Sequence, residues 1–164
     1  SDDLRGFFGV GKAGRQAIPD SFRIAGERGM DFSLEGIDLG DVHPNSVKMN
    51  LTGVSGRTLE VVAASIGGGR IQICELDGIT ANFSGDYPTL IVHNIDQPGH
   101  VTEVTSMLAH KGVNIATMQL YRKSRGGSAV MVIECDQEVP KESLAWLERL
   151  EGILKVTYCS LVEE

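Results

Sequence analysis

The chain has 164 residues and a mass of 17.6 kDa, the size of one ordinary domain or two small ones. Hydrophobic residues make up 41% and charged residues 23%, which supplies a core and excludes wholesale disorder. The net charge of -7 repels phosphate backbones, so we expect no nucleic-acid partner, and no apolar run has the roughly 18 residues that a membrane span needs.

The first residues carry no targeting signal and no clear hydrophobic period. Residues 1–17 are rich in glycine and basic side chains, so we expect a flexible segment without assigned structure. The run Gly6–Lys12 approaches a phosphate-binding loop, but Ala13 replaces the Ser or Thr that would hold Mg²⁺. Because no basic start precedes an apolar stretch, we expect a cytoplasmic protein. The first residue is a serine, which indicates a fragment of a longer chain.

A helix followed by an antiparallel meander is expected over residues 18–86. The helix begins near Pro19 with apolar residues at positions i, i+4 and i+7, and Gly29 lies where a left-handed cap would end it. Asp77-Gly78 is the strongest hairpin signal in the chain. A period of two predicts strands at residues 47–51, 58–66, 70–76 and 79–83.

A second unit is expected over residues 87–164, where the hydrophobic periods are cleaner. Strands are predicted at residues 90–92, 116–120, 129–135 and 153–160, and helices over 101–108 and 140–151. The resulting order is βαββαβ, the ferredoxin-like arrangement. The sequence therefore predicts an α+β chain of two units.

The junction between the first strand and the first helix of this second unit is the best candidate for a binding site. It runs through Asn94, Asp96, Gly99 and His100. N–H groups at a helix start favour an anion such as an amino-acid carboxylate, and Gly99 leaves the backbone bare. The alternative is a purely structural role, a proline in the first turn of the helix. That role explains Pro98 but not the other residues of the string from Asn94 to His100. We expect Asn114 at the same end, as a turn residue or a ligand for an amino group, and we expect Gly99→Val to fill the site without unfolding the chain.

Two further strings flank predicted strands, with His43 and Asn45 in one, and Ser65, Gly67, Gly68 and Gly69 in the other. A two-residue hairpin turn needs one or two glycines, and a third lets a backbone or ligand approach closely. A turn and a substrate or subunit contact therefore stand as equal alternatives for the glycines. A structural strand entry is the favoured interpretation of the first string, since proline extends the residue before it.

The cysteines and histidines do not form a metal-binding pattern. Cys74, Cys135 and Cys159 lie far apart with no Cys-x-x-Cys pair, and the four histidines are scattered. We therefore expect no metal in this chain, and cysteines that behave as buried small hydrophobic residues in a reducing compartment.

Residues 88–160 resemble an ACT domain, a βαββαβ module that senses amino acids. The strings that carry the resemblance are LIVHNIDQPGHVTEV and HKGVNIATMQLYR. It implies an effector site that includes Asn114 and the loop positions Asn94 and Asp96, where serine-binding relatives often have His and Asn. It also implies that two ACT domains pair side by side, with the effector site at the interface of a homodimer.

The preceding residues 19–86 are similar to the beta chain of the iron–sulfur-dependent bacterial L-serine dehydratase, in which an allosteric-substrate-binding domain precedes an ACT domain. The matching strings are DVHPNSVKMNLTG, AASIGGGRIQICELDG and FSGDYPTLIVHN. This similarity implies a partner alpha chain that carries a 4Fe-4S cluster, and L-serine as the first candidate effector. Some phosphoglycerate dehydrogenases carry a homologous pair of domains, so the regulatory tail of such an enzyme, or a free-standing sensor, is the alternative.

The segments that hold the active-site histidines of the dehydratase family do not occur in this sequence. Those segments read G-P-S-S-S-H-T and G-H-G-T-D, and neither is found. We therefore expect no catalytic residue in this chain and no serine deaminase activity from it alone. The whole enzyme would convert L-serine to pyruvate and ammonia.

Overall fold

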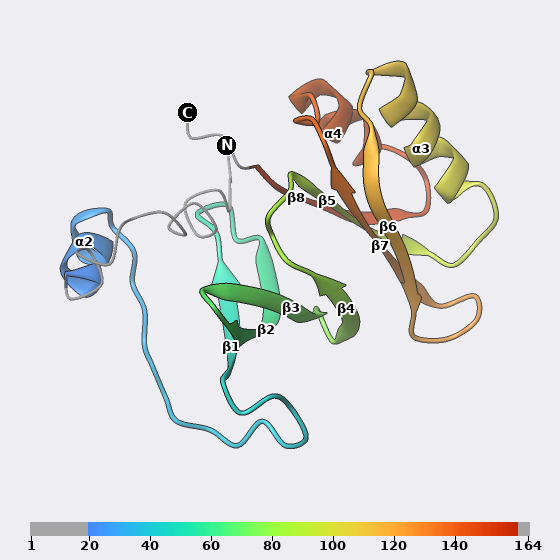
Figure 1. Ribbon diagram of the computed structural model, residues 1–164. Coiled ribbons are helices and arrows are strands. Elements are labelled where there is room, and N and C mark those ends of the chain that lie inside the picture. Colours follow the sequence, from blue (N-terminus) through green and yellow to red (C-terminus); the bar gives the residue numbers. More distant parts are fainter. Residues whose placement is uncertain (1–19, 161–164) are drawn as a thin grey trace.

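The computed structural model describes residues 20–160, which form two four-stranded antiparallel sheets joined in sequence (Figure 1). The segment 1–17 and its Gly6–Lys12 loop lie outside the described residues. The predicted α+β class is confirmed, because a helix and a meander are followed by a sheet with both of its helices on one face.

The first sheet is the predicted meander. Its strands follow the chain in the order β1-β2-β3-β4, and the helix α2 that precedes them has no buried residue. Phe22 of α2 stacks on Phe32 at 5.1 Å between ring centroids, and both rings stay exposed. The elements are α2 (Ser21–Glu27), β1 (Ser46–Thr52), β2 (Thr58–Gly67), β3 (Arg70–Leu76) and β4 (Ile79–Phe83).

The second sheet has the predicted ferredoxin-like order. Its strands lie side by side in the order β6-β7-β5-β8. Each helix leads the chain to an edge strand, α3 from β5 to β6 and α4 from β7 to β8. The elements are β5 (Thr89–Ile95), α3 (His100–His110), β6 (Ile115–Arg122), β7 (Ser128–Cys135), α4 (Lys141–Leu147) and β8 (Ile153–Cys159).

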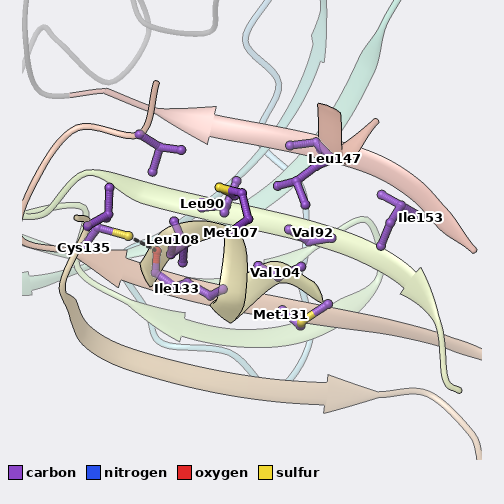
Figure 2. Close-up of a cluster of buried hydrophobic side chains, with 13 residues drawn as sticks. Leu90, Val92, Val104, Met107, Leu108, Met131, Ile133, Cys135, Leu147 and Ile153 are labelled. Atoms are coloured by element: carbon purple, nitrogen blue, oxygen red, sulfur yellow. Dashed lines mark hydrogen bonds between the residues drawn. The ribbon is translucent and has the colours of Figure 1, made fainter. Parts of the chain in front are cut away.

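Alternating apolar residues place the main core between this sheet and its helices. Leu90 and Val92 of β5 point toward Val104 and Leu108 of α3, and all four are fully buried (Figure 2). Burial of each such side chain contributes about 1.5–3 kcal/mol. The core therefore holds α3, and with it the start of the helix, at a set position over the sheet.

The opposite face of the second sheet packs on the first sheet, which the sequence did not predict. Ile91 and Val132 lie in one buried cluster with Val61, Ile73 and Phe83 of the first sheet. Each sheet thus covers the apolar face that the other leaves open, as in sheet-on-sheet packing.

Polar contacts also join the two sheets. Lys155 Nζ lies 2.7 Å from Asp77 Oδ2 and donates to the Thr58 carbonyl oxygen at 2.5 Å. Arg57 donates through Nη1 to Glu148 Oε1 at 3.0 Å and through Nη2 to the carbonyl oxygen of Val156, on the edge strand β8, at 2.5 Å. The arginine therefore covers part of the β8 edge.

Candidate functional site

Two turns at one end of the second sheet hold the predicted binding loop between them. The N–H of Ile95 donates to the carbonyl oxygen of Gly152 at 2.8 Å, in the turn between α4 and β8. The N–H of Asp96 donates to the carbonyl oxygen of Gly127 at 2.8 Å, in the turn between β6 and β7. The loop from β5 to α3 is therefore fixed on both sides by backbone hydrogen bonds.

The start of α3 lies in the predicted binding loop, and its role as an anion site stays a prediction. No side chain caps the helix, so its first-turn N–H groups keep their partial positive charge toward the loop. Gly99 has φ 107, a conformation that other residues adopt only with strain, although a Cβ there would meet nothing within 4 Å. Gly99→Val would therefore strain the backbone at the start of α3, and the expectation that it leaves the fold intact stays a prediction.

Asn94 presents a buried acceptor atom at this end of the sheet. Its side chain follows Leu90 and Val92 in the alternation of β5, so it lies on the face that α3 covers. The residue is 5% exposed, and its Nδ2 donates to the Ile95 carbonyl oxygen at 2.7 Å. Within residues 20–160, its Oδ1 is one of the buried side-chain atoms without a hydrogen-bond partner. A ligand that donates a hydrogen bond would remove a desolvation cost of about 1–3 kcal/mol.

Asp96 is tied to the turn between β6 and β7. Its Oδ2 accepts hydrogen bonds from the Gly126 N–H at 3.0 Å and from Arg122 Nη1 at 3.2 Å. These two donors lower the pKa of the Asp96 carboxyl. The negative charge of Asp96 is therefore balanced within the chain.

Asn114 lies at the opposite end of the sheet from Asn94 within one chain, so the expectation that the two share an end is wrong. Asn94 and Arg122 are both paired with Ala129 on β7, whereas Ile115 is paired with Cys135 at the far end of that strand. The separation is about 20 Å over six residues of strand. The physical reason is that β5 and β6 are parallel, so α3 returns the chain to the end where β5 began. Asn114 Nδ2 donates there to Asp136 Oδ2 at 2.5 Å.

His100 is a buried part of the loop support. Its Nδ1 lies 2.9 Å from Glu103 Oε2, and the residue is 7% exposed. A Cβ at Gly152 would lie 2.5 Å from His100 Nε2, so the ring occupies space that only glycine leaves free. The ring therefore packs the start of α3 against the turn before β8.

The triple glycine is explained by its turn. Gly67 pairs with Arg70, so Gly68 and Gly69 are the two central residues of the hairpin, and their φ values are 64 and 75. Such a turn needs positive φ at both positions. Gly67 has φ 87 beside a register shift, as at a bulge, so all three glycines meet a backbone requirement.

The other predicted residues of the first unit gather at that same end of the first sheet. Asn45 donates its N–H to His43 Nδ1 at 3.2 Å, and the N–H of Ser65 donates to the Asn45 carbonyl oxygen at 2.9 Å. His43, Asn45 and Ser65 are exposed. The structure brings these residues together beside the glycine turn, and a contact with a substrate or a subunit stays a prediction.

The described residues hold no group of three His, Cys, Asp or Glu side chains that would hold a metal ion. The cysteines there are free, and burial raises the pKa of Cys135 to about 11 and that of Cys159 to about 12. None of the described helices is long and apolar enough to cross a membrane.

Comparison with known proteins places the second sheet in a family. Residues 89–152 match the ACT domain family. The chain contains an ACT domain. Its first strand, β5, and its first helix, α3, carry the loop, the uncapped helix start and the buried Asn94 acceptor described above.

Relatives of known name match the chain well beyond the ACT domain. The probable L-serine dehydratase beta chain of Bacillus subtilis is 35% identical over 142 residues, 87% of this chain and 64% of the relative. The L-serine dehydratase beta chain of Peptoniphilus asaccharolyticus is 30% identical over 89% of this chain and 65% of the relative. The D-3-phosphoglycerate dehydrogenase of Methanocaldococcus jannaschii is 31% identical over 71% of this chain, but over 22% of the relative.

The predicted resemblance to L-serine dehydratase beta chains is confirmed, and so is the relation to phosphoglycerate dehydrogenases. The chain spans slightly less than two thirds of the length of the two beta chains, at 64% and 65%.

Sequence reasoning missed two residues that build the ACT loop. Arg122 ends the string HKGVNIATMQLYR but was given no role, Gly152 was not linked to the loop, and both act through partners more than 20 positions away in the chain. The sequence offered a weak signal for Arg122, because it is the last residue of the alternating strand β6 and lies next to the β6–β7 turn.

Proposed function

We propose that this chain is the regulatory beta subunit, or part of one, of a two-chain L-serine dehydratase that converts L-serine to pyruvate and ammonia. The observation that carries the proposal is the match to proteins of that name over the first sheet as well as the ACT domain. We assign no catalytic residue to this chain. A 4Fe-4S cluster on a partner alpha chain would supply the Lewis acid at the substrate hydroxyl.

The role proposed for the ACT domain is to bind an amino-acid effector, with L-serine as the first candidate. The uncapped start of α3 suits the carboxylate, and the buried Oδ1 of Asn94 suits the ammonium. These two groups lie at one end of β5, joined by a loop of a few residues. A zwitterion the size of an amino acid therefore fits the polarity of this end of the sheet.

The complete site would form between two copies paired through β6. Of the two edge strands of the ACT sheet, β8 has its Val156 carbonyl oxygen covered by Arg57, whereas β6 carries a large exposed apolar side chain, Leu120, on the α3 face. Two-fold pairing runs the two β6 strands antiparallel, because a symmetric interface uses the same patch on both copies. That arrangement sets the partner's Asn114 beside the Arg122 end, and so beside the loop that Asn94 begins.

Calorimetry with L-serine and a panel of other amino acids tests the effector role. We expect a dissociation constant between about 10 μM and 1 mM, the weak range that suits a regulatory site. Analytical ultracentrifugation at saturating effector should show a dimer. If no amino acid binds at millimolar concentration, the effector role fails.

Co-expression with an L-serine dehydratase alpha chain tests the subunit assignment. We expect the two chains to co-purify as a stoichiometric complex in the cytoplasmic fraction. The alternative function is the regulatory region of a phosphoglycerate dehydrogenase, which the match to those enzymes supports over a smaller part of the chain. No complex with the alpha chain, together with a dinucleotide-binding domain encoded in the same reading frame, would favour that alternative.

A further inference from the structure

A row of three residues crosses the ACT sheet below the start of α3. Asn94 of β5 and Arg122 of β6 are each paired directly with Ala129 of β7. Directly paired residues share a face of the sheet. Asn94 lies on the α3 face, so the other two lie there too.

The middle residue of the row leaves room between the two polar ones. Ala129 has the smallest side chain that carries a Cβ, and neighbouring strands lie about 4.8 Å apart, so the Cα atoms of Asn94 and Arg122 are about 10 Å apart. An amide side chain and a guanidinium on a long stem close most of that distance. Asn94 and Arg122 can therefore contact the two ends of one small ligand, with an ammonium toward the unpartnered Oδ1 of Asn94.

The guanidinium of Arg122 is held in place but keeps free donors. One nitrogen, Nη1, donates to Asp96 Oδ2 at 3.2 Å. The Arg122 side chain is 60% exposed, and a guanidinium has five N–H donors in a fixed fork. Asp96 is itself fixed by the Gly126 N–H, so the fork is oriented by a carboxylate that cannot swing away.

The local charge at the row also favours a carboxylate. Arg122 and Arg125 both act on Asp96, and the second carboxylate near the start of α3, that of Glu103, lies 2.9 Å from His100 Nδ1. The start of α3 adds partial positive charge from the other side. A ligand carboxylate therefore meets donors from both the helix and the end of β6.

We propose that Arg122 holds the carboxylate of the effector, and that Asp96 is the positioning residue that orients the guanidinium. The ligand class is an α-amino acid with a free carboxylate. Asp96 contacts no part of the ligand in this arrangement. The inference rests on the proposed effector role of the ACT domain, and it names the residue that binds the carboxylate of the effector.

Calorimetry on the full chain with L-serine and L-serinamide tests the assignment, because the amide lacks the carboxylate charge. Arg122→Gln should weaken L-serine binding at least tenfold and change serinamide binding less than twofold. Lys123→Gln is the matched control, since it removes the same charge from the next residue, and it should leave both affinities within twofold. Asp96→Ala should weaken L-serine binding several-fold, and Asp96→Asn, which keeps an acceptor for the Gly126 N–H, should restore part of it.

The outcomes separate this inference from the effector role. If the wild type binds no amino acid of the panel, the effector role fails and the inference fails with it. If the wild type binds L-serine and Arg122→Gln binds it equally well, the inference alone is overturned. Equal losses in Arg122→Gln and Lys123→Gln overturn it too, because they would show a diffuse effect of charge. Melting temperatures of the Arg122→Gln and Lys123→Gln variants should stay close to that of the wild type, since the Arg122 side chain is 60% exposed and that of Asp96 is partly exposed.

Discussion

Gly152→Ala should destabilise the chain more than alanine does at ACT-domain glycines where a positive φ is the only obstacle. Gly152 has φ 81, and a Cβ there would lie 2.5 Å from Nε2 and 2.7 Å from Cε1 of His100. Left-handed backbone costs an alanine about 1–2 kcal/mol. Displacing a buried ring by overpacking costs about 1–3 kcal/mol more. The expected loss in the free energy of unfolding is therefore about 2–5 kcal/mol.

Gly112→Ala is the matched control for this prediction. Gly112 has φ 67 and also follows a helix, but a Cβ there would meet nothing within 4 Å. Its expected cost is the backbone part alone, about 1–2 kcal/mol. In the double variant with His100→Ala, the overpacking part of the Gly152→Ala loss should disappear, which a double-mutant cycle measures as a coupling of about 1–3 kcal/mol.

Urea unfolding followed by the fluorescence of Trp146, the single tryptophan of the chain, gives these free energies. Equal losses for Gly152→Ala and Gly112→Ala would refute the reasoning. So would a coupling of zero with His100→Ala, because the ring would then not occupy the space over Gly152.

Three further predictions concern other parts of the molecule. Burial lowers the pKa of His93 despite the nearby Asp77 carboxylate, so below about pH 6.5 the unfolded chain binds more protons than the folded chain. The free energy of unfolding should therefore fall from about pH 7.5 to about pH 5.5. Urea midpoints measured across this range should change less in His93→Gln. Gly68→Ala should cost about 1–2 kcal/mol by thermal or urea unfolding, and Gly68→Asn should cost less because asparagine tolerates positive φ; equal costs would argue against the turn explanation. The chain purified alone and without oxygen, in the presence of iron and sulfide, should stay colourless and release no pyruvate from L-serine, and a brown protein or measurable turnover would contradict this.

Elements set by neighbouring residues were predictable from the sequence. The hairpin at Asp77-Gly78 follows from two residues that accept positive φ, here 47 and 75, and the strands beside it follow from their period of two. The start of α3 was found because a strand, a glycine and an apolar helical period follow one another within a few positions. In each case the deciding forces act within one turn or one strand.

Features that depend on distant contacts were not predictable. Asn114 was placed at the wrong end, because its position depends on which strands pair and not on its own neighbours. The packing of the two sheets on each other brings together Ile91 and Ile73, each of which only looked like a generic core residue. Asp96 was expected in the effector site, whereas its partner Arg122, 26 positions further along the chain, was given no role.

The cover that Arg57 provides on one edge of the ACT sheet has a consequence for the size of the assembly. A sheet with two open edges accepts a neighbour on each side and grows into a ribbon without limit. Here Arg57 occupies one carbonyl oxygen of the β8 edge, that of Val156. In the dimer that we propose through β6, this contact would make the β8 edge less able to accept a further copy. Arg57 would thereby favour a finite complex over a fibre.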